Sequence, residues 1–85
     1  MLRDFLRVLL RQADFTIRIK AGRAQLWQGK APKGFVDDCD LIAVDQQLSQ
    51  GLIFGCQRSR GLVLEFSGIP ESCHQRFRNI WQIHA

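Results

Sequence analysis

Residues 51–81 carry the pattern that most constrains the fold, because they combine a β-hairpin with an amphipathic helix. Apolar residues alternate along two short segments, namely Leu52, Phe54 and Cys56 in the first and Leu62, Leu64 and Phe66 in the second. Alternation with a period of two places each set on one face of a sheet. Ser59-Arg60-Gly61 between the segments is expected to form a three-residue loop with Gly61 in the left-handed conformation. This register sets Cys56 opposite Leu64, so that both apolar sets share one face.

A helix is expected to follow this hairpin. Pro70 suits the first position of a helix, where its missing N–H leaves no hydrogen bond unmade. One helical stripe then contains Cys73, Phe77, Ile80, Trp81 and His84. Such a stripe needs an apolar sheet face to pack on, and the hairpin provides one.

The preceding part of the chain repeats this order. Phe15, Ile17 and Ile19 alternate, and Ala21-Gly22 is expected to form a two-residue turn that returns them opposite Ala24 and Leu26. Pro32 can open a second helix, whose inward side carries Phe35, Cys39, Ile42, Ala43 and Gln46. A further apolar line on this helix consists of Leu41, Val44 and Leu48. Either this line contacts a partner, or the helix ends near Asp45 and Leu48 turns back into the core.

These elements predict an α+β fold, in which an N-terminal helix precedes a ββαββα domain. The domain should contain a four-stranded, mainly antiparallel sheet with helices packed on it. Both units place a glycine and a proline ahead of the helix, as Gly29 and Pro32 and as Gly68 and Pro70, so they are candidates for a diverged structural repeat. We expect an amphipathic N-terminal helix over residues 1–12 and a single small domain over residues 13–85.

The expected leading helix has one apolar and one basic side. Its apolar face consists of Leu2, Phe5, Leu6 and Leu9, and its basic side of Arg3, Arg7 and Arg11. It is too short and too charged to span a bilayer, which needs about 20 apolar residues, and it has no signal-peptide core or cleavage site. Three destinations stay open for its apolar face: the back of the sheet beside Trp27, Ile53 and Val63, the Leu41/Val44/Leu48 line of this or another subunit, or an anionic membrane surface.

The charge of the 85-residue chain varies along its length. The net charge of +4 divides into +6 over residues 1–33, −4 over residues 34–50 and +2 over residues 51–85. A basic first third mildly favours phosphate-bearing partners. The three cysteines, Cys39, Cys56 and Cys73, form no C-x-x-C motif and fall on inward positions. They should be buried thiols in a reducing compartment, which favours a cytoplasmic location or one at the inner membrane surface.

No catalytic, cofactor or metal site is expected. Cys73 and His74 are neighbours, but adjacent helical residues point about 100° apart and do not face each other. His74 and His84 are too isolated to form a metal site. Asp37, Asp38 and Asp40 spread around a helix instead of converging from a loop as hard cations require.

Basic residues gather at the two hairpin ends. Lys20 and Arg23 flank the first turn, and Arg58 and Arg60 lie at the second. Basic tips can contact phosphates, which positions a protein on nucleic acid without reading its sequence. They also serve solubility and discourage edge-to-edge pairing of sheets, so both interpretations stay open.

Residues 15–81 resemble a small bacterial family of unknown function. The resemblance depends on Phe15, Ile17, Ile19, Gly22, Gly29, Pro32, Phe35, Cys39, Ile42-Ala43, Gly51, Ile53, Leu64, Phe66-Ser67, Ile69-Pro70 and Gln75-Arg76-x-Arg78-Asn79-Ile80. It implies a short ββαββα-like domain, which in that family usually follows a hydrophobic membrane segment. A charged leading segment stands here instead, and the resemblance implies no activity, cofactor or catalytic residue.

The sequence therefore predicts a small non-enzymatic protein-interaction module. The alternative prediction is a nucleic-acid-binding accessory protein that uses the basic hairpin tips. We expect a protein partner or self-association, weak contact with an anionic membrane as a further option, and no small-molecule substrate.

Overall fold

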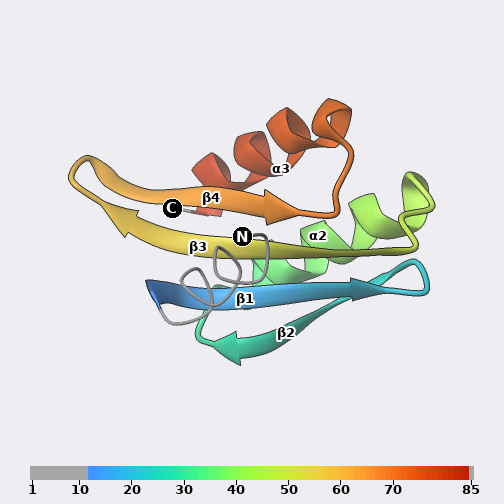
Figure 1. Ribbon diagram of the computed structural model, residues 1–85, viewed down its shortest axis with the longest axis horizontal. Coiled ribbons are helices and arrows are strands. Elements are labelled where there is room, and N and C mark those ends of the chain that lie inside the picture. Colours follow the sequence, from blue (N-terminus) through green and yellow to red (C-terminus); the bar gives the residue numbers. More distant parts are fainter. Residues whose placement is uncertain (1–11, 85) are drawn as a thin grey trace, which may run out of the picture.

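The chain forms two β-hairpins, each followed by a helix (Figure 1). The computed structural model describes residues 12–84, and residues 1–11, on which the predicted leading helix falls, lie outside the described part. The elements are β1 (Ala13–Lys20), β2 (Arg23–Gly29), α2 (Lys33–Asp45), β3 (Gln50–Arg58), β4 (Gly61–Ser67) and α3 (Glu71–His84). The predicted α+β fold with ββαββα order is confirmed.

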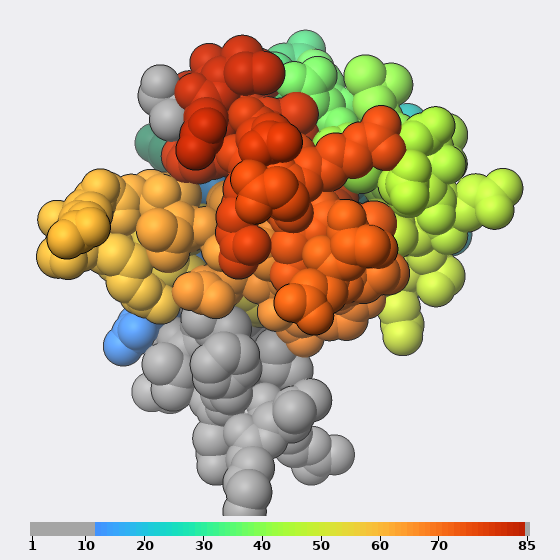
Figure 2. Space-filling view, turned by 90° about the horizontal axis from the view of Figure 1, so that it is seen from above, coloured from blue at the N-terminus to red at the C-terminus, as the bar shows by residue number. Residues whose placement is uncertain are grey.

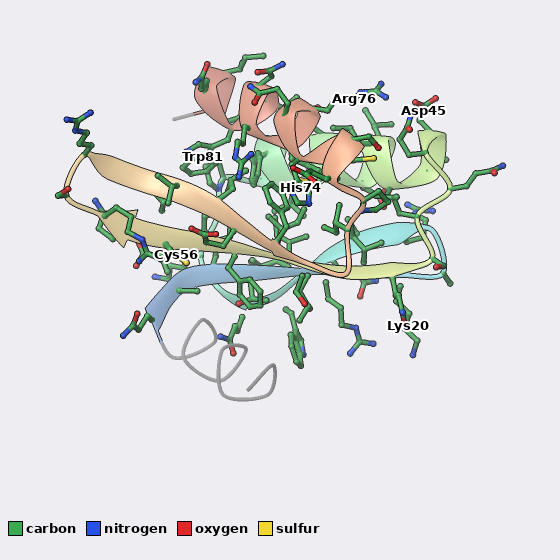
Figure 3. All side chains as sticks on the ribbon, turned by 45° about the horizontal axis from the view of Figure 1, so that its top comes forward. Lys20, Asp45, Cys56, His74, Arg76 and Trp81 are labelled. Atoms are coloured by element: carbon green, nitrogen blue, oxygen red, sulfur yellow. The ribbon has the colours of Figure 1, made fainter. Side chains whose placement is uncertain are left out.

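The four strands form one sheet in the order β2-β1-β3-β4. Every neighbouring pair is antiparallel. Both helices cover the same face of the sheet (Figure 3). The two hairpin turns lie at opposite ends of the sheet, because β1 and β3 run antiparallel beside each other (Figure 1).

The first hairpin has the predicted register. Ile19 pairs with Ala24 and Ile17 with Leu26. Ala21 and Gly22 form the turn with φ angles of 52° and 79°. Two consecutive positive φ angles are the geometry of a type I′ turn, whose twist matches that of the strands.

The predicted register of the second hairpin is wrong by one residue. Gly55, not Cys56, pairs with Leu64, and the turn contains only Ser59 and Arg60, because Arg58 pairs with Gly61. Gly61 does have the expected positive φ, at 115°. A shift of one residue moves a whole strand to the other face. The set Leu52, Phe54 and Cys56 therefore lies on the face away from the helices, and Ile53, which was expected there, faces the helices.

The error has a physical cause in β3. Its helix-facing positions alternate between glycines and larger residues, and the glycines make room for neighbouring side chains. A Cβ atom on Gly55 would collide with the ring of Phe15, and one on Gly51 would collide with Ile69. The opposite face carries Thr16, Phe54 and Cys56, all fully buried. Because both faces of β3 are apolar, alternation alone could not assign its inward side.

The helices pack on the sheet through the predicted apolar residues, but Gln46, which was expected on the inward side, is exposed at the end of α2. α2 begins after Pro32 and buries Phe35, Cys39, Ile42 and Ala43, while α3 buries Cys73 and Phe77. At the centre of the core, the rings of Phe15 and Phe35 both contact Trp81, with centroid distances of 5.5 and 4.9 Å. All three cysteines are unpaired and buried, as expected, although Cys56 lies on the other sheet face.

The two hairpin–helix units correspond with a constant offset. β2 and β4 begin at Arg23 and Gly61, and α2 and α3 begin at Lys33 and Glu71, so each pair is 38 residues apart. Pro32 and Pro70 have the same separation. The central pair Thr16 and Phe54 of β1 and β3 is also 38 residues apart. This arrangement agrees with the predicted structural repeat.

Candidate interaction surfaces

Two side-chain pairs join α2 to α3. Arg76 Nη1 donates to Asp45 Oδ2 at 3.1 Å, and His84 Nε2 donates to Asp38 Oδ2 at 2.7 Å. The early part of α3 meets the end of α2 in the first pair, and the end of α3 meets the early part of α2 in the second, so the two helices run antiparallel, side by side. Figure 3 shows Arg76 beside Asp45. A hydrogen bond from Gln46, followed by that from Arg76, lowers the pKa of Asp45.

Large apolar side chains on both of these helices are exposed. Leu41 is 67% exposed and Val44 52% exposed on α2, and Ile83 is 76% exposed on α3. Leu41 follows Asp38 by three residues and precedes Asp45 by four, so it lies on the side of α2 that reaches α3. Ile83 precedes His84, which contacts Asp38. We call Leu41, Val44 and Ile83 the helix seam.

The predicted apolar line on α2 is only partly correct. Leu41 and Val44 are exposed, but Leu48 is 6% exposed and belongs to the core. The helix ends at Asp45, after which the chain folds Leu48 inward, as the alternative interpretation expected. Sequence reasoning missed Ile83. The sequence feature that could have indicated Ile83 is its position about 100° around the helix from the apolar stripe of α3.

The structure does not bring the four basic tip residues together. Lys20 and Arg23 lie at one end of the sheet, and Arg58 and Arg60 at the other; Figure 3 shows Lys20 at the end away from the β3–β4 turn. Arg23 is also engaged, because its Nε and Nη2 donate to the Asp40 carboxylate at 2.9 and 2.7 Å. Arg58 Nη2 lies 3.8 Å from Glu65 Oε1.

Asp40 closes the edge of β2. Besides the two bonds from Arg23, its Oδ1 accepts the backbone N–H of Ala24 at 2.8 Å. The Arg23 hydrogen bonds, followed by that of Ala24, lower the pKa of Asp40, and the carboxylate raises the pKa of Arg23. We call Asp40, Arg23 and the Ala24 N–H the β2 clamp.

The cysteines and histidines have structural surroundings. His74 Nε2 donates to the Ile69 carbonyl oxygen at 2.9 Å, and its ring stacks on Phe66 at 4.1 Å between centroids. Burial raises the pKa of the Cys39 thiol, with a smaller contribution from Asp38, and burial also raises that of Cys56. Such thiols stay protonated and react poorly as nucleophiles. Within residues 12–84, no three His, Cys, Asp or Glu side chains lie close enough to hold a metal.

A hollow runs between the outer edge of β4 and α3. It is lined by Arg60, Leu62 and Leu64 from the strand side and by Arg78, Trp81 and Gln82 from the helix, with Gly61 and Val63 completing it. Leu64 is buried, and Leu62 and Trp81 are half-buried. We call this hollow the β4 groove. The sequence could not indicate it, because strand order decides which strand lies at the edge.

The chain was also compared with known proteins. A family described as "Protein of unknown function (DUF3634)" matches residues 6–85. No curated protein and no solved structure matches the chain. In the described part of the chain, no helix has the length and apolar character needed to cross a membrane.

Proposed function

This chain belongs to that family of unknown function, and we propose from its geometry that it is a small non-enzymatic protein-interaction module. The observation that carries the proposal is the helix seam. Three large apolar side chains there, Leu41, Val44 and Ile83, are each more than half exposed, whereas the core beneath them is closed. Large apolar side chains exposed on two neighbouring helices favour a protein partner or a second copy of the chain.

The polar side chains support a non-enzymatic role. His84 is held by Asp38, Arg76 by Asp45, and His74 by a backbone carbonyl. Catalytic acids and bases need access to a substrate and a matched partner. In this domain the contacts of His84 and Arg76 connect α3 to α2, and the contact of His74 connects α3 to the chain after β4. Buried, unpaired thiols agree with a reducing location such as the cytoplasm.

Site-specific photo-crosslinking in cells tests the seam. A photoreactive amino acid at Val44 should give a discrete adduct, and the additional change Leu41→Glu should remove that adduct. Leu26 of β2 offers a matched control, since it is 41% exposed on another surface. Leu26→Glu should leave the Val44 adduct unchanged. A second photoreactive probe is placed at Ile83. The proposal would be overturned if neither the Val44 probe nor the Ile83 probe formed an adduct, or if the Val44 adduct persisted in the Leu41→Glu variant.

The leading residues form a second part of the proposal. The apolar residues Leu2, Phe5, Leu6 and Leu9 precede the described residues, and a short isolated helix is marginal in water. We expect them to bind a protein surface first and an anionic membrane weakly. Leu6→Glu should then lower the unfolding temperature or remove self-association. Unchanged stability with lost binding to anionic liposomes would instead identify a peripheral membrane protein.

The nucleic-acid alternative receives less support from the geometry. Its four candidate contacts divide between opposite ends of the sheet, and Arg23 and Arg58 each face a carboxylate. A nucleic-acid interface would show affinity that falls steeply with salt, because bound counterions are released from the phosphates. Absence of binding at low salt would remove this alternative.

A further inference from the structure

The β4 groove lies beside an open sheet edge. β4 is the last strand in the order β2-β1-β3-β4, so alternate backbone N–H and C=O groups along it face away from β3. In the space-filling view, the β3–β4 hairpin projects past α3 (Figure 2). Apart from Gly61 itself and its two chain neighbours, no described residue has an atom within 4 Å of the position that a Cβ on Gly61 would occupy.

The floor and the rim of the groove differ in character. Leu62, Leu64 and Trp81 provide the apolar floor, and Arg60 and Arg78 provide the charge. No acidic side chain among the described residues lines it. The guanidinium of Arg78 lies 5.1 Å from the centroid of the Phe66 ring.

The arginines of the groove differ from most other arginines of the described domain, although Arg18 likewise forms no ion pair. Arg23, Arg58 and Arg76 each face a carboxylate. Within the described part of the chain, neither Arg60 nor Arg78 forms an ion pair. Two unneutralised guanidinium groups beside an apolar floor favour a partner that brings carboxylates.

The internal repeat gives independent support. With the offset of 38 residues, Asp40 of the β2 clamp corresponds to Arg78, and Ala24 corresponds to Leu62. In the first unit, the Asp40 carboxylate accepts the N–H of Ala24 and closes the strand edge. In the second unit, a cation stands where that carboxylate would be, and among the described side chains none accepts the N–H of Leu62. Within the described residues, the β4 edge therefore presents a free backbone N–H and a positive charge at the position where the β2 edge is satisfied by the carboxylate of Asp40.

We propose that the β4 groove binds an extended acidic peptide segment of a partner protein, which adds to the sheet as a fifth strand beside β4. Backbone hydrogen bonds to the edge supply affinity, as in other cases of strand addition. Apolar side chains of the segment rest on Leu62, Leu64 and Trp81, and its carboxylates pair with Arg60 and Arg78. This surface is separate from the helix seam, so the proposal goes beyond the proposed function and does not depend on the seam.

A titration of the ¹⁵N-labelled full chain tests the proposal with defined probes. The first probe is a peptide of about eight residues with the repeat Val-Thr-Glu-Thr, a typical strand length, so that its Val and Glu side chains fall on the same face of the strand. It should shift the amide resonances of Gly61, Leu62, Arg78 and Trp81. A second probe with Lys in place of Glu should bind at least about tenfold more weakly because its charge is reversed. A third probe, N-methylated at alternate residues, keeps its side chains and charge but loses backbone donors, and it should also bind weakly.

Variants of the protein make the test specific. Arg78→Asp places a carboxylate at the position equivalent to Asp40, where it can accept the Leu62 N–H, and should abolish binding of the Val–Glu probe. Lys33→Asp, with the same charge change at the start of α2, should leave binding unchanged. Leu41→Glu should also leave it unchanged, which separates this result from the seam experiment. The proposal is overturned if the probe shifts no resonances, shifts those of other surfaces, or binds as tightly when its charge is reversed or its amides are methylated.

Discussion

The change Gly55→Ala tests the register of the second hairpin most directly. Gly55 pairs with Leu64 on the helix face of β3, and the ring of Phe15 lies where its Cβ would be. In the one-residue-shifted register predicted from the sequence, the same position faces away from the helices. An added methyl there would replace glycine in a strand and would stabilise the fold.

The magnitude follows from the packing around Phe15. An alanine at position 55 must displace a ring that is 1% exposed and whose centroid lies 5.9 Å from that of Phe35. Overpacking a core by one methyl costs about 1–3 kcal/mol, and the lower entropy of the unfolded chain offsets about 0.4–1 kcal/mol. The net loss of about 1–2 kcal/mol should lower the unfolding temperature of a domain of this size by about 4–16 °C.

A double-mutant cycle with Phe15→Leu isolates the contact. Leucine keeps an apolar side chain but removes the outer ring atoms that meet position 55. Urea unfolding of the four proteins should show that Gly55→Ala costs about 1 kcal/mol less in the Phe15→Leu background. An equal cost in both backgrounds, or a stabilising Gly55→Ala, would refute the placement of the ring over Gly55.

Three further predictions concern the core, the clamp and the thiols. All three cysteines should react slowly with a thiol reagent under native conditions and quickly in denaturant, because they are buried and the pKa of Cys39 is raised; rapid native labelling of two would contradict their placement. In urea unfolding, Leu48→Ala should lower the free energy of unfolding by about 2–4 kcal/mol and Leu41→Ala by less than about 0.5 kcal/mol. Equal losses would contradict the finding that Leu48 is buried and Leu41 is exposed. The pKa of Asp40 is lowered in the folded chain, so its contribution to stability is complete above the ordinary carboxyl pKa and is lost as pH falls through the folded value. Between about pH 5 and pH 2, the stability of the unaltered chain should therefore fall more steeply than that of Asp40→Asn, and parallel curves would contradict the clamp.

The elements with one apolar face could be predicted from the sequence. In β1, Phe15, Ile17 and Ile19 alternate with polar neighbours, and in α2 the buried positions recur at helical spacing, so periodicity identified their inward sides. β3 defeated the same reasoning because Phe54 and Ile53 are both fully buried, on opposite faces. The glycines that receive Phe15 and Ile69 carry no hydropathy signal, although they decide which face is which.

The interaction surfaces were harder to predict because they depend on pairs of residues far apart in the chain. Asp40 and Arg23 both carry charge in exposed sequence contexts, but nothing local indicates that one will bind the other across 17 residues. Strand order is equally non-local, and it determines that β4, not β3, is an edge. Leu41 and Val44 were found because their spacing on one helix exceeds what a single buried stripe needs.

The repeat explains why the fold was predictable while the binding surface was not. Both units share a two-residue turn position, a proline before the helix and an apolar spacing that place a helix over a hairpin, and these features are visible in the local sequence. The units differ at the polar positions that face the sheet edges: Asp40 opposite Arg23 and Ala24 in one, Arg78 opposite Gly61 and Leu62 in the other. A carboxylate that satisfies an edge from within leaves no need for a partner, whereas an arginine beside an open edge offers donors that only another chain can use. The asymmetry between two otherwise equivalent units therefore locates the surface at which this small domain has most to gain from binding.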